Sequence, residues 1–265
     1  MKHKFRASFF KGAFLFLLVS CSLFNGGRNE NWNESLLKDS LVENKDDLLL
    51  RHLESLGEEF VMHSDVKVRR IKKRSRSYFQ KTSTFLIDQE KELFTKLKDK
   101  NLEFYIVYDP RPFHFSFPGG KIFFSKGLLK KYIEHESFLK SVMLYELIRL
   151  EKNIYRKSKT IPIGFYNLSY IVSLNRLPFE IRSRLNKWTY SILERNAMDS
   201  GAFIQWIQII NSNVSDFSFY LGDRQSIIRE EKEFKDFVIK YYGEEVNLAR
   251  NTTSSREFYI FKRGL

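Results

Sequence analysis

Few side chains in this sequence are placed for acid–base, nucleophilic or metal chemistry. Beyond the first 20 residues the histidines are His52, His63, His114 and His135. No two of them are four residues apart and none belongs to a Cys/His cluster, so they match no metal-ligating pattern. The sole cysteine is Cys21 and no G-x-S-x-G motif is present, so the sequence does not indicate a serine or cysteine nucleophile. The charged residues Glu146 and Arg149 stand in a strongly apolar run, where a buried charge needs a partner.

The N-terminal residues indicate export and attachment of lipid. A cationic start, Lys2 to Arg6, precedes an apolar stretch from Ala13 to Leu18, which is the pattern of a secretory signal. This stretch is shorter than the roughly 18–20 residues that span a bilayer. Leu18-Val19-Ser20-Cys21 resembles a bacterial lipobox, in which the cysteine is diacylated and becomes the first mature residue. The alternative is an ordinary signal peptide with a chance cysteine.

Three regions are expected: a signal peptide (1–20), a lipidated N-terminus with a flexible tether (21–45) and a folded domain (46–265). Ser22, which follows the cysteine, indicates the outer membrane and a domain facing the periplasm. The net charge is +13, and an excess of positive charge suits anionic lipid or acidic polymers as neighbours. A generally basic proteome would explain it equally well. Nucleic acid is not expected as a partner of an exported lipoprotein.

The elements that would position these residues indicate an α+β fold, mainly helical around a small mixed sheet. Strands are expected at 102–108, 113–117 and 121–125, and the turn Pro118-Gly119-Gly120 joins the last two. Helices are expected at 47–63, 83–100, 136–152, 179–195, 200–211 and 224–242, with helical sequence also from Leu128. A short strand is expected at 257–261. The 26 phenylalanines predict a core rich in that residue.

Residues 113–150 resemble the core of the HtpX/BepA-type zinc metallopeptidases. In that family a strand ending in N-A-F-A-x-P-G-G precedes a strand x-I-F-V-T-x-G-L-L and then a helix bearing H-E-x-x-H. Here Phe117-Pro118-Gly119-Gly120 keeps the turn, and Ile122-Phe123 with Ser125-Lys126-Gly127-Leu128-Leu129 keeps the second strand and the start of the helix. Glu136, Leu139 and Val142 match the family's lead-in to the helix. The resemblance implies a zincin-like, metallopeptidase-like domain.

The chain departs from this family at the zinc ligands. Tyr145-Glu146-Leu147-Ile148-Arg149 stands at the H-E-x-x-H position, so only the family's catalytic glutamate is kept, as a vestigial Glu146. Arg149 cannot lose its proton to become a ligand, and Tyr145 would be an unusual one. The family's third ligand aligns with Arg184, or one turn earlier with Glu180. We therefore expect no metal and no cofactor.

The resemblance also suggests what replaces the metal and where a peptide would bind. We expect the guanidinium of Arg149 roughly where the zinc charge would be, paired with Glu146 or Glu180. The alternative is that Arg149 points to solvent and Glu146 caps neighbouring backbone. His114 lies on the strand that borders the substrate cleft in the resembled family. The expected peptide-docking edge is the strand Lys121-Ile122-Phe123-Phe124-Ser125, or its neighbour.

Three functions remain open at this stage. The first is a non-catalytic, peptidase-like lipoprotein that binds unfolded or envelope polypeptides as a chaperone or adaptor. The second is an active metallopeptidase with unusual ligands, in which Glu146 acts as the base. The third is a purely structural envelope lipoprotein. Seven cations within Lys67–Arg76 form either a solvated basic helix face or a patch on anionic headgroups.

Overall fold

A small mixed sheet forms between residues 68 and 125 in this computed structural model, which describes residues 47–156, 167–243 and 253–265. In the order in which they pair, the strands are β1 (Val68–Arg70), β2 (Glu103–Val107), β4 (Lys121–Ser125) and β3 (His114–Phe117). β2 and β4 are parallel, and the other two pairs are antiparallel. The three strands predicted from the sequence are confirmed, while the edge strand β1 was not predicted.

The reversal between β3 and β4 depends on two glycines. Gly119 and Gly120 have φ values of +91° and +95°, a region that residues with a Cβ rarely adopt. After β4 the backbone at Gly127 lies against that of Pro110. A Cβ at position 127 would lie 1.9 Å from the carbonyl oxygen of Pro110. The predicted Pro-Gly-Gly turn is therefore confirmed, and Gly127 is required by packing.

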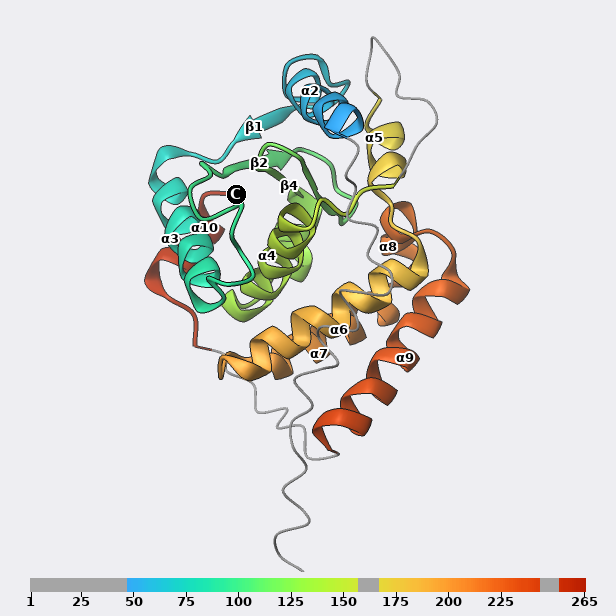
Figure 1. Ribbon diagram of the computed structural model, residues 1–265. Coiled ribbons are helices and arrows are strands. Elements are labelled where there is room, and N and C mark those ends of the chain that lie inside the picture. The colour runs from blue at the N-terminus through green and yellow to red at the C-terminus, as the bar shows by residue number, and fades with distance from the viewer. Residues whose placement is uncertain (1–46, 157–166, 244–252) are drawn as a thin grey trace, which may run out of the picture. The chain divides into compact units, whose positions relative to one another are not determined.

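Helices make up most of the described chain (Figure 1). They are α2 (Asp47–His63), α3 (Lys73–Gln89), α4 (Glu136–Glu151), α5 (Leu168–Asn175), α6 (Phe179–Arg195), α7 (Ser200–Ser212), α8 (Val214–Leu221), α9 (Arg224–Tyr242) and α10 (Arg256–Arg263), with a short π-helix, η1 (Leu128–Tyr132). The fold class is α+β, as predicted. No helix within the described ranges is both long and apolar enough to cross a bilayer.

The two faces of the sheet are covered by different helices. On one face Phe123 of β4 packs edge-on against Phe60 of α2, with ring centroids 5.5 Å apart. On the other face Phe104 of β2 meets Phe79 of α3, at 5.2 Å, and α4 packs against β3. Phenylalanines therefore fill the core on both faces, as their number in the sequence predicted.

The helices α6, α7 and α9 form a second layer on α4. α4 contacts both α6 and α7, and α9 packs on these two helices (Figure 1). α4 thus lies between the sheet and the second helical layer. This position explains why its sequence is apolar nearly all round, because a helix that is enclosed on every side buries residues on every side.

The helix predicted at 83–100 is wrong in its bounds. α3 begins ten residues earlier, at Lys73, and ends at Gln89, and turns follow up to residue 99. The buried carboxylate of Glu151 accepts the backbone N–H groups of Lys96, at 3.1 Å, and Leu97, at 3.0 Å. A side chain that satisfies backbone donors in this way replaces the helical hydrogen bonds of that segment.

Two other predictions need correction. Part of the basic run Lys67–Arg76 is the strand β1, paired with β2, and not a helix face. The strand predicted at 257–261 is the helix α10, because Ser255 Oγ caps its first turn by accepting from Phe258 N at 3.2 Å. Phe258 and Phe261, three residues apart, are then buried together while Tyr259 is exposed. The sequence also did not predict α5 and α8.

Candidate functional site

Glu146 and Arg149 lie at the centre of the fold, and neither side chain is exposed to solvent. The sheet, α3, α6 and α7 all pack on the α4 helix that carries them. Burying an isolated charge costs several kcal/mol, so each of these charges needs a partner inside the core. Glu146 Oε2 lies 3.7 Å from Arg149 Nη1. The predicted i,i+3 ion pair is confirmed, and the alternative of a solvent-exposed Arg149 is excluded.

Two side chains of β3 complete the surroundings of the Glu146 carboxylate. His114 Nδ1 lies 2.6 Å from one carboxylate oxygen, and Ser116 Oγ donates to the other at 2.6 Å. Because His114 and Ser116 are two residues apart on a strand, both point to the same face, towards α4. Burial alone would raise the pKa of Glu146. The charge of Arg149 and the hydrogen bonds outweigh it, so the pKa lies below its ordinary value.

The guanidinium of Arg149 connects three parts of the chain. Its Nε donates to the carbonyl of Ile154 at 3.1 Å. Its Nη2 donates to the carbonyl and to the side-chain oxygen of Asn175, at 3.1 and 2.9 Å. Burial works to lower the pKa of Arg149, but Glu146 and the surrounding groups raise it, so the side chain stays protonated. Arg149 therefore holds the end of α4 to the end of α5.

Two tyrosines flank the imidazole of His114. The ring centroids of Tyr145 on α4 and Tyr220 on α8 lie 5.6 and 5.0 Å from that of His114. Burial raises the pKa of both phenols well above the ordinary value, and the negative charge of Glu146 raises it further. Both side chains are therefore neutral, and neither supplies a phenolate.

A second buried ion pair lies between α6 and α9. Arg182 Nε donates to a carboxylate oxygen of Glu230 at 2.8 Å, and Asn186 Nδ2 donates to the other oxygen at 2.6 Å. Arg182 Nη1 also donates to the carbonyl of Leu221 at 3.1 Å. Within the described residues Glu146–Arg149 and Arg182–Glu230 are thus two separate buried charge pairs, and neighbouring elements hydrogen-bond to both. Arg149 Nη1 is the exception, because it is buried, makes no hydrogen bond and has only its ion pair with Glu146.

The residues at the family's ligand positions do not fit a zinc ion. A catalytic zinc site needs three protein donors that can lose or lack a proton. Here Tyr145 is a neutral phenol and Arg149 is a protonated guanidinium. Glu180 is exposed on α6 and Arg184 is partly exposed, and neither side chain makes a hydrogen bond or an ion pair within the described ranges. In that part of the chain no three His, Cys, Asp or Glu side chains come together as metal ligands.

The buried cluster also lacks the order of a catalytic triad. In a Ser-His-Glu triad the serine hydroxyl donates to the histidine, and the carboxylate holds the far side of the imidazole. Here the hydroxyl of Ser116 and the imidazole of His114 are both bound to the carboxylate of Glu146. The hydroxyl of Ser116 donates to Glu146 and not to His114, and the serine is wholly buried. The arrangement stabilises a buried carboxylate and does not activate a nucleophile.

The strand Lys121–Ser125 has no free edge for a peptide. β4 pairs with β2 on one side and with β3 on the other, so the expected docking role is wrong for this strand. Its neighbour β3 is an outer strand, but all four of its residues are buried, and α2, α4 and α5 pack on it. Lys121 Nζ is paired with Glu58, so it anchors α2 to the sheet.

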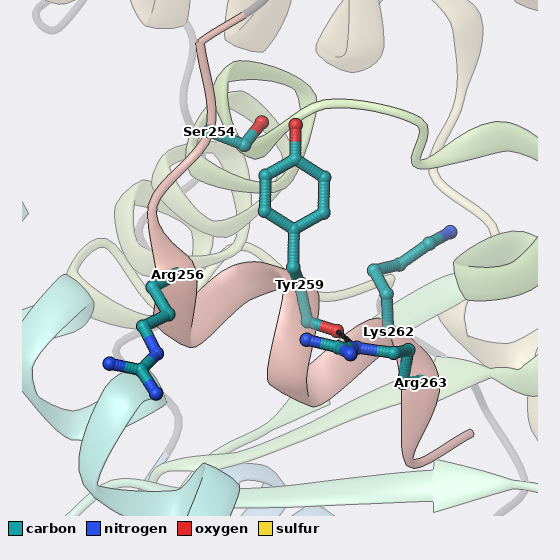
Figure 2. A pocket seen from close by; sticks show the side chains of 5 residues that line it. All are labelled: Ser254, Arg256, Tyr259, Lys262 and Arg263. Atoms are coloured by element: carbon teal, nitrogen blue, oxygen red, sulfur yellow. Dashed lines mark hydrogen bonds between the residues drawn. The ribbon is translucent and has the colours of Figure 1, made fainter.

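A surface hollow lies over α10, and none of the Glu146 cluster residues lines it. It encloses about 590 Å³ and is lined by Ser254, Arg256, Tyr259, Lys262 and Arg263. Figure 2 shows Arg256 and Lys262 pointing to opposite sides of this hollow. The ammonium of Lys262 is bound to the carbonyls of Leu129 and Ile133, at 2.5 and 2.7 Å. Lys262 therefore serves to fix α10 on the domain.

Sequence reasoning identified part of this core and missed part of it. It singled out Glu146 and Arg149, and it noted His114 through the resemblance. It did not identify Ser116 or Asn175, which reach Glu146 and Arg149 only through the tertiary fold. A polar residue every second position on β3 is the one signal that could have indicated Ser116. Cys21, the predicted lipid attachment site, lies outside the described residues, as do the whole predicted signal peptide and the whole predicted tether.

No protein-family model matches the chain, and no curated protein matches it.

Proposed function

We propose that this protein is a lipid-anchored, non-catalytic relative of the envelope metallopeptidases that binds polypeptide as a chaperone or adaptor. One observation carries the non-catalytic part of the proposal. The guanidinium of Arg149 lies 3.7 Å from Glu146, at the helix position where the resembled family has its second histidine ligand. Glu146, the counterpart of the family's catalytic base, is thereby already neutralised inside the core.

Electrostatics argues against a dication beside this helix. A guanidinium keeps its charge at any physiological pH, and two positive charges about 4 Å apart repel by about 4 kcal/mol for each unit of metal charge at an effective dielectric constant of about 20. Each oxygen of the Glu146 carboxylate is also engaged by a side chain of β3, and the residue is wholly buried, so the carboxylate does not face bulk water. Hydrolysis through Glu146 would require this cluster to be dismantled.

Polypeptide binding is proposed from the resemblance and does not depend on β4. The described domain contains a strand–turn–strand–helix arrangement, from β3 to α4, of the kind that the resemblance implies. The Glu146–Arg149 pair, held by hydrogen bonds from β3 and α5, joins these elements. A chaperone or adaptor needs such a scaffold and a client surface, but no reacting group. The anchor is proposed at Cys21, which would fix the domain on a membrane of the bacterial envelope.

The test combines metal content, client binding and cleavage on the full-length chain. We expect less than about 0.1 zinc per protein after purification in zinc-containing buffer, binding of fluorescently labelled unfolded casein, and no cleavage of it over a day. Stoichiometric zinc with casein cleavage that Glu146→Gln abolishes would instead identify an active peptidase. Zinc-free protein that fails to bind casein would favour a purely structural envelope protein.

The membrane part of the proposal has its own test. Expression of the chain in a bacterial host followed by fractionation should place the wild type in the membrane pellet and Cys21→Ser in the soluble fraction. Ser22→Ala is the matched control, because it changes the neighbouring residue and leaves the thiol. Cys21→Ser that remains in the membrane would contradict the lipid anchor.

A further inference from the structure

Three cations surround one tyrosine ring at the edge of the sheet. Lys67 Nζ, Arg69 Cζ and Lys126 Nζ lie 5.0, 5.8 and 4.9 Å from the ring centroid of Tyr108. The topology brings them together, because Tyr108 and Lys126 directly follow the parallel strands β2 and β4, whose C-terminal ends lie side by side. Lys67 precedes β1 and its carbonyl accepts from Tyr108 N at 2.9 Å. We call Lys67, Arg69, Lys126 and Tyr108 the basic notch.

Two cations next to the basic notch have polar partners. Arg70 pairs with Glu103 at 2.6 Å, and Lys72 Nζ donates to the carbonyl of Gly264 at 3.1 Å. Lys67, Arg69 and Lys126 make no ion pair or hydrogen bond through their side chains within the described ranges. The distances to the ring keep the three charged groups within about 11 Å of one another. Like charges this close repel, and an anion placed among them would relieve the repulsion.

The notch has a shape as well as a charge. A small cavity of about 70 Å³ is lined by Arg69, Lys126 and Tyr108, by the apolar side chain of Ile106 and by the chain end around Gly264. Its size suits one compact anionic group, and its floor is aromatic and apolar. Arg263, the residue before Gly264, is also exposed and adds positive charge next to the cavity.

We propose that the basic notch binds the phosphate group of an acidic phospholipid and presses this edge of the sheet on the membrane surface. Phosphate is recognised by guanidinium and ammonium groups that converge on its oxygens. The choice of a lipid, as opposed to a soluble phosphate, rests on the proposed anchoring of the chain in a membrane. Lys126 and Tyr108 lie outside the basic run of the sequence, so the site is defined by the fold and not by the run alone.

The experiment measures binding of full-length protein carrying Cys21→Ser, which cannot receive lipid, to two kinds of vesicle. One contains phosphatidylglycerol and phosphatidylcholine, and the other only phosphatidylcholine. Each cation near an acidic surface strengthens binding roughly fivefold, so Lys67→Ala/Arg69→Ala/Lys126→Ala should bind the acidic vesicles about a hundredfold more weakly. The matched control is Arg224→Ala/Lys232→Ala/Lys240→Ala on α9, which removes the same charge from exposed positions.

The α9 control variant should bind acidic vesicles within about threefold of the Cys21→Ser protein from which both triple variants are made. The Cys21→Ser protein, the notch variant and the control should bind phosphatidylcholine vesicles equally. A notch variant that binds acidic vesicles as well as the control does would overturn the proposal. Arg69→Lys, which keeps the positive charge, should keep binding within a few-fold, and an unchanged circular dichroism spectrum of the triple variant excludes loss of folding as the cause. Vesicle binding by the Cys21→Ser protein does not depend on lipid at Cys21 or on zinc content. The proposed polypeptide-binding function can therefore be refuted while phospholipid binding by the notch is confirmed.

A second arm separates lipid from soluble phosphate. Inorganic phosphate is titrated into the same protein while the backbone amide resonances of Tyr108 and Lys126 are followed by NMR. Shifts that disappear in the notch variant, together with the loss of vesicle binding, support a phosphate site that the lipid occupies. If phosphate causes shifts at Tyr108 and Lys126 but the notch variant binds vesicles as well as the control does, the ligand is a soluble phosphate and the lipid assignment is overturned. Loss of vesicle binding without shifts supports the membrane surface as the ligand.

Discussion

Removing the guanidinium from the core should destabilise the protein strongly, and Arg149→Met tests this. The pair Arg149–Glu146 at 3.7 Å is worth about 4.5 kcal/mol of Coulomb attraction at an effective dielectric constant of about 20. The variant also leaves the oxygens of Ile154 and Asn175 without their donors. Relief from burying the guanidinium offsets part of this loss. We expect the free energy of unfolding to fall by 3–5 kcal/mol, the usual cost of breaking a buried pair on one side.

Urea unfolding at pH 7, followed by circular dichroism, gives the measurement. Replacing both partners, in Arg149→Met/Glu146→Leu, should recover most of the loss, because no charge is then left buried alone. Arg229→Met is the matched control, since Arg229 pairs with Glu233 at 2.9 Å but is 63% exposed, and it should cost less than about 1 kcal/mol. A loss below about 1 kcal/mol for Arg149→Met, or a double variant less stable than the single one, would refute the reasoning.

The pH dependence of the same variant has a defined sign. In the wild type the pKa of Glu146 is lowered, so its interactions stabilise the fold above the unfolded-state pKa of about 4.3. That stability is lost as the pH falls through the folded-state pKa. Without Arg149, burial should raise the pKa of Glu146, and the variant then gains stability as the carboxylate takes up a proton. The destabilisation should therefore shrink between pH 7 and pH 4, and a difference that grows over this range would contradict the assigned charges.

Three further predictions concern the site and its supports. Tyr145→His/Arg149→His introduces two histidines four residues apart, but the variant should still bind less than stoichiometric zinc by mass spectrometry. The reason is that Glu180 is exposed and brings no third ligand, and one bound zinc per chain would contradict this. Gly127→Ala places a Cβ 1.9 Å from the Pro110 oxygen and should cost about 3 kcal/mol in urea unfolding, while Gly264→Ala, with its nearest contact at 3.3 Å, should change stability by less than about 1 kcal/mol. Glu151→Ala leaves the backbone amides of Lys96 and Leu97 without their acceptor. Hydrogen exchange at both amides should therefore accelerate, and the free energy of unfolding should fall by about 2–3 kcal/mol. Unchanged exchange would show that the carboxylate does not hold this segment.

The sequence predicted those elements whose own pattern decides their structure. α2 and α6 begin and end at the predicted residues, since their apolar residues recur on one helical face. The β3–β4 hairpin follows from the Pro-Gly-Gly turn. The strand predicted at 257–261 failed because a short run of apolar and aromatic residues fits a strand or a helix equally well. Capping by Ser255 and burial of Phe258 against the domain decide in favour of the helix.

The core site was predictable only in its local part. Glu146 and Arg149 are three residues apart on one helix, so their pairing follows from helix geometry and from the cost of a buried charge. Asn175 lies 26 residues further along the chain, and its contact with Arg149 depends on how α5 packs. Glu180, the other partner considered for Arg149, faces solvent on α6. No periodicity in a single sequence encodes such contacts between distant elements.

The two outer strands of the sheet differ in a way that bears on self-association. A long, flat, uncovered edge strand can pair with another molecule and start aggregation. β3 is enclosed by helices, and β1 is only three residues long and carries Arg69 and Arg70. Cross-strand pairing between molecules is therefore disfavoured at both ends while the fold is intact. Detachment of α2 or α5 would uncover the phenylalanines of β3, so partial unfolding, and not the native state, is where we expect this chain to become prone to aggregation.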